Sequence, residues 1–251
     1  MLVVADELRL VERMSRLGTE TAFEVLVRAK ALEQKGRDVI HLEIKEPDFD
    51  TPPNIVEAAV NALHAGYTHY NPAAGLPELR QAIAAEIAST RGVDVSAVEV
   101  VVMPGGKPII SFTMLALVDR GDEVIFPDPG FPIYQSMIEF VGGKAVPLPL
   151  REDREFRLDV DELRGLITPR TRLIIVNSPQ NPTGGVLTSR DVRELAAAIA
   201  GRDDIMVLSD EIYNRRIFEG RHHSIISLPG FKDRTLLLDG FSKTYAITGL
   251  C

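Results

Sequence analysis

The sequence predicts an α/β protein built on a doubly wound, mostly parallel sheet. Strand-like and helix-like patterns alternate from about residue 98 to the end of the chain. Several strand-like runs are uninterrupted aliphatic stretches, such as "LIIV" and "TLLL", which is typical of strands that helices cover on both faces. A length of 251 residues suffices for one large α/β domain, or for one domain with a small appendage.

The first hundred residues predict three helices before the sheet begins. Residues 19–36 carry one apolar stripe. The Pro52-Pro53 pair marks the start of a second helix, and residues 75–92 predict a third with Pro77 in its first turn. The chain shows neither a secretory signal nor a membrane span, which needs about 20 apolar residues.

From there the predicted elements alternate. The predicted strands are Val98–Met103, Glu123–Phe126, Lys144–Leu148, Arg172–Asn177, Ile205–Ser209 and Thr235–Asp239, and the predicted helices are Pro108–Val118, Pro132–Val141, Val160–Ile167 and Ser189–Ala200. Ligands of such sheets bind outside the carboxyl ends of the strands, so we expect the site residues directly after the strands.

Composition narrows the classes of partner. A formal net charge of -8 argues against nucleic acid and anionic membranes as partners. Cys251 is the single cysteine, so the chain forms no internal disulfide and no cysteine-rich metal site, which fits a reducing cytosol. Composition therefore favours a cytoplasmic protein without a cysteine-rich metal site, and we expect it to bind no metal.

Glycines and aromatic residues follow the first two predicted strands. "PGGKPII" places Gly106 and Lys107 at the start of a helix, where backbone N–H groups and the helix dipole favour a phosphate, with a tight turn as the equal alternative. "DPGFP" places Phe131 at a strand end, with Tyr134 close by. An aromatic ring there can stack on a planar ligand, although core packing is the commoner role.

Polar side chains follow the later strands. Asn181 in "SPQNPTGG" either forms an Asx turn or points its amide at a ligand. Asp210 ends a buried strand, where a carboxylate costs desolvation energy unless a cation pairs with it. Tyr213, three residues further on, lies on the same side if a helical turn starts there. Lys243 follows the last strand, where burial makes a lysine a nucleophile toward a carbonyl; a surface lysine is the alternative.

These features together predict a site for pyridoxal 5'-phosphate. A phosphate cradle, an aromatic plate, a carboxylate and a reactive lysine are the parts that hold this cofactor. The lysine forms a Schiff base with the aldehyde. The carboxylate pairs with the pyridinium nitrogen and keeps the ring cationic, so that the ring can accept electrons.

The chain also resembles the fold-type I, pyridoxal-phosphate-dependent aminotransferases of class I/II, the aspartate aminotransferase-like group. The resemblance runs from about Thr19 to the last residue. Its motifs are "EPDFDTP", "YNPAAGLPELRQAI", "NSPQNPTGG", "SDEIY" and "GFSKTYAITGL", in the family's order and spacing. It implies an enzyme of amino acid metabolism and biosynthesis that transfers an amino group from an amino acid to a 2-oxo acid, with the donor left open.

The resemblance implies roles for the residues around the cofactor ring. Lys243 carries the cofactor and moves a proton between the substrate Cα and the cofactor. Asp210 binds the pyridine nitrogen. Tyr213 and Asn181 hydrogen-bond the phenolic oxygen, and Phe131 stacks on the ring.

It also implies contacts with the phosphate. The backbone around Gly106 and Lys107 holds the phosphate, and Ser242 belongs to the same cofactor site. Tyr70 matches a tyrosine that reaches across a dimer interface to the partner's phosphate. The resemblance therefore implies an obligate homodimer.

Three positions depart from the family pattern. Lys45 replaces a glycine whose backbone lies close to the substrate carboxylate, where a lysine either crowds the pocket or supplies an extra cation. Gly240 replaces a serine that helps to bind the phosphate in many relatives. Cys251 replaces the phosphate-binding arginine, which removes a charge-assisted contact.

The resemblance divides the chain into two parts. Residues 1–45 correspond to an N-terminal arm and helix of a small domain, and residues 46–251 to the large, cofactor-binding domain without its last, antiparallel strand. The remaining small domain is absent, so we expect a truncated chain with impaired activity. Two alternatives stay open: another enzyme on the same cofactor and fold (a β-lyase, decarboxylase or synthase), and a non-catalytic truncated paralogue or fragment.

Overall fold

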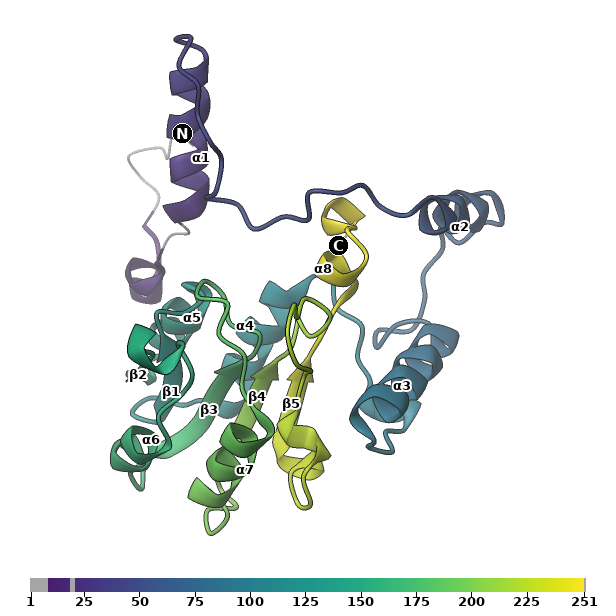
Figure 1. Ribbon diagram of the computed structural model, residues 1–251. Coiled ribbons are helices and arrows are strands. Elements are labelled where there is room, and N and C mark those ends of the chain that lie inside the picture. Colours follow the sequence, from purple (N-terminus) through teal and green to yellow (C-terminus); the bar gives the residue numbers. More distant parts are fainter. Residues whose placement is uncertain (1–8, 19–20, 251) are drawn as a thin grey trace.

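The computed structural model of the protein describes residues 9–18 and 21–250, and its centre is a five-stranded sheet (Figure 1). The strands are β1 (Glu123–Asp128), β2 (Lys144–Pro149), β3 (Thr171–Asn177), β4 (Met206–Asp210) and β5 (Thr235–Leu238). They lie in the order β2-β1-β3-β4-β5, and every neighbouring pair is parallel. The predicted α/β fold with a parallel sheet is therefore confirmed.

Helices precede the sheet and connect its strands. The α-helices are α1 (Thr21–Glu33), α2 (Pro53–His64), α3 (Pro77–Arg91), α4 (Gly106–Leu117), α5 (Ile133–Val141), α6 (Val160–Leu166), α7 (Ser189–Ala198) and α8 (Phe241–Thr244). Short 3₁₀ helices are η1 (Glu12–Arg16), η2 (Ala97–Glu99), η3 (Glu152–Arg154), η4 (Ile225–Ser227), η5 (Lys232–Arg234) and η6 (Thr248–Leu250). Both α2 and α3 begin at a proline, as predicted.

The two faces of the sheet bury two separate apolar clusters. Along β3 the side chains alternate, as the pleat of a strand requires. Leu173 and Ile175 pack toward α4 and α5, whereas Ile174 and Val176 pack toward α6 and α7. Because both faces are covered, β3 carries the continuous aliphatic run "LIIV".

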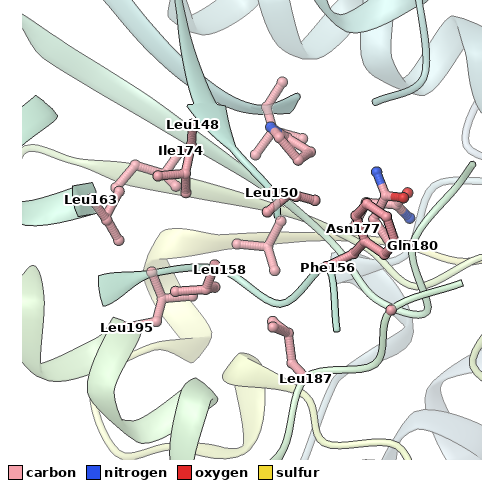
Figure 2. A pocket seen from close by; sticks show the side chains of 14 residues that line it. Leu148, Leu150, Phe156, Leu158, Leu163, Ile174, Asn177, Gln180, Leu187 and Leu195 are labelled. Atoms are coloured by element: carbon pink, nitrogen blue, oxygen red, sulfur yellow. The ribbon is translucent and has the colours of Figure 1, made fainter. Parts of the chain in front are cut away.

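A small cavity of about 30 Å³ lies between the sheet and helices α6 and α7 (Figure 2). Apolar side chains line most of it, and Asn177 and Gln180 lie on one side. The amides of both residues donate to the backbone, Asn177 to the carbonyl of Asp210 and Gln180 to that of Pro129. Pockets for organic ligands are about ten times larger, so this cavity is a packing feature of the core.

The predicted strand Val98–Met103 is wrong. Ser96 and Glu99 form a capping box that starts η2, and the chain then continues without regular structure. A strand exists only where a neighbouring strand pairs with its backbone. Here the N–H of Val102 donates instead to the carbonyl of Ala74, in the turn before α3. The other predicted strands and the helices are confirmed to within a few residues.

The chain before α2 lies outside the layers of the sheet. η1 packs on α5, where the guanidinium of Arg16 donates to the carbonyls of Glu139 and Phe140. α1 stands away from the sheet (Figure 1), and its Phe23 and Val27 side chains are exposed. Across the described residues, the helices are too short or too polar to cross a bilayer.

The strand order places the ends of β3, β4 and β5 next to one another. Asp210, the last residue of β4, pairs in register with Asn177 of β3 and with Leu238 of β5. All five strands run in the same direction, so the segments that follow them meet at the carboxyl edge of the sheet. Most of the predicted site residues lie in these segments.

Candidate active site

Asp210 is a buried carboxylate at the end of β4. Its side chain accepts a hydrogen bond from the Tyr134 hydroxyl at 2.5 Å and one from the N–H of Ile212 at 3.2 Å. The residue is 4% exposed, and burial raises the pKa of its carboxyl group to about 6. Within the described part of the chain no lysine, arginine or histidine forms an ion pair with it. Asp210 is thus held in place but lacks a cationic partner.

Lys243 lies on α8, five residues beyond the end of β5. Its Nζ donates to the carbonyl of Lys45 at 2.6 Å, and its own carbonyl accepts from Arg216 at 2.7 Å. The side chain is half-buried, and burial lowers the pKa of the Lys243 amine. A lowered pKa increases the fraction of neutral amine, which is the nucleophilic form.

Tyr213 lies in the turn that follows β4. Burial raises the pKa of its hydroxyl to about 12, and the nearby Asp210 carboxylate adds to the rise. The hydroxyl therefore stays protonated at neutral pH. Since it bonds to none of the described side chains, it is free to donate to a ligand.

Asn181 lies in the loop after β3, which is tied to β4. The amide oxygen of Asn177 accepts from the N–H of Asn181 at 2.8 Å, and the Asn177 Nδ2 donates to the carbonyl of Asp210 at 3.0 Å. The Nζ of Lys45 donates to the carbonyl of Pro182 at 2.6 Å. These contacts connect the loop that carries Asn181 to both Asp210 and the backbone that holds Lys243.

Phe131 lies in the loop after β1, against the ring of Tyr134. The two ring centroids are 5.9 Å apart, and the planes meet at 89°, which is an edge-to-face contact. Phe131 is only partly buried, although it packs on the apolar cluster under α4 and α5. Phe131 therefore packs on the core while part of its side chain stays exposed.

Gly106 and Lys107 begin α4, close to the end of β5. Gly105 caps the helix with a φ of 89°, a conformation that favours glycine. A side chain at Gly106 would meet Leu238 of β5, so the start of α4 lies beside that strand. The first N–H groups of a helix have no partner within it and suit an anion. The Lys107 ammonium lies 5.5 Å from the ring centroid of Phe23 in α1.

Ser242 and Tyr70 differ in their relation to the site. Ser242 precedes Lys243 on α8, and its carbonyl accepts from the N–H of Ile247. Tyr70 lies between α2 and α3 with a fully exposed side chain, so it contacts none of the other candidate residues. Within one chain the structure links the segments that follow β3, β4 and β5 through the contacts described for Asp210, Asn181 and Lys243, and leaves Tyr70 apart.

Two of the three departures from the family pattern lie in the described structure. Lys45 bridges Lys243 and the Pro182 carbonyl, as described above. A side chain at Gly240 would come within 3.0 Å of Ile212 Cδ1, so glycine there permits close packing of the two strand ends. Cys251 lies outside the described residues.

The sequence did not reveal three polar residues next to the site. Arg91 at the end of α3 forms ion pairs with Glu211 and Asp239, the residues that follow Asp210 and Leu238. The cost of burying a carboxylate at a strand end, which singled out Asp210, applies equally to Glu211. No local pattern marks Arg91, because its partners are more than a hundred residues away in sequence.

The arrangement suits a phosphorylated, cationic, planar aldehyde. A buried carboxylate without a protein cation can pair with a ring nitrogen. An amine with a lowered pKa can join an aldehyde, and a helix start can hold a phosphate. The residues present therefore fit pyridoxal phosphate.

Comparison with known proteins identifies the family. A sequence profile described as "Aminotransferase class I and II" matches residues 37–250. The chain is 44% identical to an aspartate aminotransferase of Pyrococcus abyssi over 215 residues, 85% of this chain and 55% of that protein. It is 42% identical to an aromatic-amino-acid aminotransferase of Thermococcus litoralis over 220 residues, covering 87% and 56%.

Solved structures agree with the sequence relatives. The aspartate aminotransferase from Rhizobium meliloti superposes with a TM-score of 0.92 at 36% identity, covering 96% of this chain and 61% of that one. The aspartate aminotransferase from Thermus thermophilus with maleate also gives a TM-score of 0.92, at 37% identity, covering 96% and 63%. The chain thus spans little more than half of the length of these relatives, and it belongs to the class I and II aminotransferase family.

Proposed function

We propose that this chain carries the cofactor site of a pyridoxal-phosphate-dependent aminotransferase, which transfers an amino group from an amino acid to a 2-oxo acid. The observation that carries the proposal is Asp210, a buried carboxylate without a cation from the described protein, one strand away from the strand that leads to Lys243. Class I and II aminotransferases use pyridoxal phosphate, which supplies an aldehyde and a cationic, electron-accepting ring.

Asp210 holds the ring nitrogen in this proposal. Its raised pKa of about 6 is a property of the chain without a cation beside it. An opposite charge beside a carboxylate lowers its pKa, so a bound pyridinium would keep Asp210 ionised at neutral pH. Tyr134, which donates to the same carboxylate, fixes the direction in which the free lone pairs point.

Lys243 would supply the amine that condenses with the aldehyde, with loss of water, and later a base for the proton on the substrate Cα. Burial lowers its pKa, which suits both roles. The carbonyl of Lys45 orients the amine by accepting its hydrogen bond. In this proposal Lys45 acts through its backbone, and its ammonium, bound to the Pro182 carbonyl, braces the neighbouring loop.

The remaining candidates surround the ring and the phosphate. Tyr213 stays protonated and can donate, together with the Asn181 amide, to the phenolic oxygen. Phe131, which is partly exposed, would stack on the ring. The start of α4 would hold the phosphate, with the backbone N–H groups of Gly106 and Lys107 and the Ser242 side chain as donors.

Domain and partner assignments extend the proposal. We assign residues 1–45 to a small domain and residues 46–251 to the large, cofactor-binding domain, because α1 stands away from the sheet with exposed apolar side chains. We further propose a homodimer in the cytoplasm, in which Tyr70 reaches the partner's phosphate. The full exposure of Tyr70 supports this role. Relatives are named for aspartate, aromatic amino acids and arginine, so the amino donor stays open.

The test is covalent capture of the cofactor. Pyridoxal phosphate added to the chain should give a visible absorbance band, and borohydride reduction should then fix the cofactor on Lys243, as located by mass spectrometry of peptides. Lys243→Ala should lose both signals, and Lys232→Ala, a surface lysine before β5, should keep them. Equal labelling of wild type and Lys243→Ala would overturn the proposal. Conversion of the bound cofactor to its pyridoxamine form by an amino acid separates a transaminase from a lyase or decarboxylase.

A further inference from the structure

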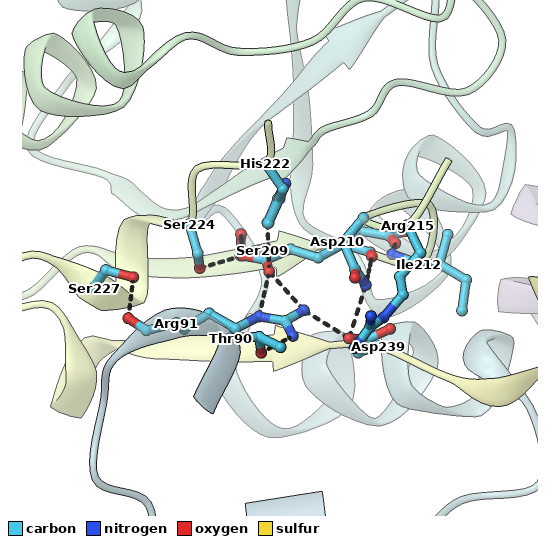
Figure 3. A network of polar contacts seen from close by, with 12 residues as sticks. Thr90, Arg91, Ser209, Asp210, Ile212, Arg215, His222, Ser224, Ser227 and Asp239 are labelled. Atoms are coloured by element: carbon cyan, nitrogen blue, oxygen red, sulfur yellow. Dashed lines mark hydrogen bonds and ion pairs between the residues drawn. The ribbon is translucent and has the colours of Figure 1, made fainter. Parts of the chain in front are cut away.

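A network of charged side chains lies directly beside the proposed cofactor site, with Arg91 and Glu211 buried and Asp239 31% exposed (Figure 3). Its centre is Arg91, the last residue of α3, whose side chain is 3% exposed. The guanidinium of Arg91 donates to Glu211 Oε2 at 3.1 Å from Nε and to Asp239 Oδ2 at 2.6 Å from Nη2. One cation therefore bridges two carboxylates from different strand ends.

Both carboxylates belong to residues that are adjacent in sequence to the strand ends of the site. Glu211 follows Asp210, and its N–H donates to the carbonyl of Leu238 at 2.8 Å, which continues the pairing of β4 with β5. Asp239 follows Leu238, and its Oδ1 accepts from the N–H of Gly240 at 2.7 Å. Gly240 is the residue from which α8, with Lys243, begins. Arg91 thus contacts the segment that carries Asp210 and the segment that carries Lys243.

The rest of the network fixes the orientation of the two carboxylates. Glu211 Oε1 accepts from the hydroxyls of Ser209, at 3.0 Å, and Ser224. Glu211 Oε2 also lies 2.7 Å from Nε2 of His222. Asp239 Oδ2 accepts from Nδ2 of Asn214 at 2.8 Å. With these partners the carboxylates have little freedom to move, provided that the central cation is present.

The network also sets the charge around Asp210. Burial raises the pKa of Asp210, and the carboxylates of Asp239 and Glu211 add to the rise. Arg91 opposes this, because its positive charge lies between those two carboxylates and offsets their negative charge. Without Arg91, the carboxylates of Glu211 and Asp239 would lose this shared cation next to Asp210, and among the described residues His222 would be the remaining ion-pair partner of Glu211.

We propose that Arg91 is a positioning residue for the cofactor site: through Glu211 and Asp239 it fixes the end of β4 against the end of β5, and so sets the relative placement of Asp210 and Lys243. This inference rests on the proposed cofactor function.

A second buried arginine provides a matched control. Arg234 precedes β5 at the opposite, amino end of the same two strands and is 8% exposed. Its guanidinium donates to backbone carbonyls, among them that of Ile205 at 2.8 Å. Replacing Arg234 by methionine removes a buried arginine of comparable burial from the same sheet without touching the carboxyl edge.

The experiment compares Arg91→Met, Arg91→Lys and Arg234→Met in the full chain. Pyridoxamine 5'-phosphate, which has no aldehyde, reports binding without the covalent step, and its affinity is measured by calorimetry where circular dichroism shows each variant folded. Amide hydrogen exchange of Glu211 and Gly240 is measured without cofactor.

Arg91→Met should weaken pyridoxamine phosphate binding at least tenfold and should speed exchange of the two amides at least tenfold. Arg91→Lys keeps the charge but loses the planar guanidinium that donates to both carboxylates. Its affinity and exchange rates should lie between those of Arg91→Met and wild type. Arg234→Met should lower the melting temperature yet leave binding within twofold and both amides unchanged. If Arg91→Met does not fold, Arg91→Lys decides, with at least a threefold loss of affinity expected.

Two results would overturn the inference. One is a folded Arg91 variant that binds within twofold of wild type, and the other is an equal loss of binding in Arg234→Met. A wild-type chain that binds no pyridoxamine phosphate would instead contradict the proposed function. The exchange of the Glu211 and Gly240 amides would still report whether Arg91 holds the two strand ends.

Discussion

Glu123 and Asp210 are both buried carboxylates of the same sheet, and they lie at its opposite edges. Glu123, at the amino end of β1, accepts from the Thr168 hydroxyl at 2.5 Å and pairs with Arg170 at 2.8 Å and Lys144 at 3.0 Å. These partners, the hydroxyl first, lower its pKa to about 2. Asp210, at the carboxyl end of β4, accepts hydrogen bonds from the Tyr134 hydroxyl and the N–H of Ile212. It forms no ion pair with a cation among the described residues, and burial raises its pKa to about 6.

The opposite pKa shifts of Glu123 and Asp210 indicate different roles for the two carboxylates. A carboxylate with a lowered pKa stabilises the folded chain in its charged form, whereas one with a raised pKa destabilises it in that form. The amino edge therefore uses its buried charge for stability. At the carboxyl edge the ionised Asp210 lowers the stability of the folded chain, and such a perturbed group is typical of a functional site.

Asp210→Asn should have the largest effect, on both the stability of the ligand-free chain and its affinity for the cofactor. Asparagine removes the unpaired charge and still accepts from Tyr134, so the ligand-free chain should become more stable by about 2–3 kcal/mol at pH 7.5, as the rise in pKa from 3.8 implies. Cofactor affinity should fall at least 100-fold, because the partner of the ring nitrogen is lost. Urea unfolding and calorimetric titration with pyridoxal phosphate measure the two effects. A variant that loses stability and affinity together would show that Asp210 is a structural residue.

The same residue predicts a pH dependence. Because the folded pKa of Asp210 lies above its unfolded value of 3.8, its contribution to stability is fully present below about pH 4 and is lost as the pH rises through about 6. The difference in unfolding free energy between wild type and Asp210→Asn should therefore change by about 2–3 kcal/mol between pH 4 and pH 7. Urea unfolding of both chains across this range measures it, and a constant difference would contradict the raised pKa.

Glu123→Gln is the matched substitution at the amino edge and should act in the opposite direction. Glutamine loses two ion pairs with largely exposed cations, so we expect a loss of about 2 kcal/mol at pH 7. The folded pKa lies below the usual 4.5, so this contribution exists above pH 4.5 and is lost as the pH falls through about 2. Cofactor affinity should stay within twofold. A larger change in affinity would mean that the two edges are coupled.

Tyr134→Phe should have a smaller effect at the carboxyl edge. It removes the 2.5 Å hydrogen bond that opposes the rise in the pKa of Asp210, so that pKa should rise further. Charged hydrogen bonds contribute about 1.5–3 kcal/mol, so stability should fall by about that amount at pH 8 and by less at pH 5, where Asp210 is protonated. Carbon-13 NMR titration of the Asp210 carboxyl group measures the shift. An unchanged pKa would show that the tyrosine does not act on the charged form.

The same contrast explains what the sequence could predict. The positions of Asp210, Lys243 and Asn181 follow from one rule, that polar residues after buried strands gather at the carboxyl edge, and the parallel sheet confirms the rule for these segments. The role of each residue stays a prediction. The strand at Val98–Met103 failed because an apolar run specifies a strand but not the neighbour that must pair with it.

The missed residues have a different cause. The sequence around Arg91 does not indicate its role, because its partners Glu211 and Asp239 lie 120 and 148 positions away. Tyr134 looked like a second candidate for stacking, but the structure buries it completely and turns its hydroxyl toward Asp210. Long-range pairing of charges and the direction of a buried hydroxyl depend on tertiary packing, which periodicity and composition do not encode.

Gly240→Ser should have the smallest effect, and it tests where the phosphate lies at the carboxyl edge. The backbone at Gly240 is extended, with a φ of -177°, so serine fits its conformation without strain. The added Cβ would come within 3.0 Å of Ile212 Cδ1, the end of a flexible side chain that can move by a few tenths of an ångström. We expect a loss of stability below about 1 kcal/mol. The new hydroxyl precedes α8 and follows β5, whose last residue Leu238 lies beside the start of α4, so affinity for pyridoxal phosphate should rise a few-fold, whereas affinity for unphosphorylated pyridoxal should not change. A gain for both ligands would place the added contact at the ring, and no gain for either would locate the phosphate away from Gly240.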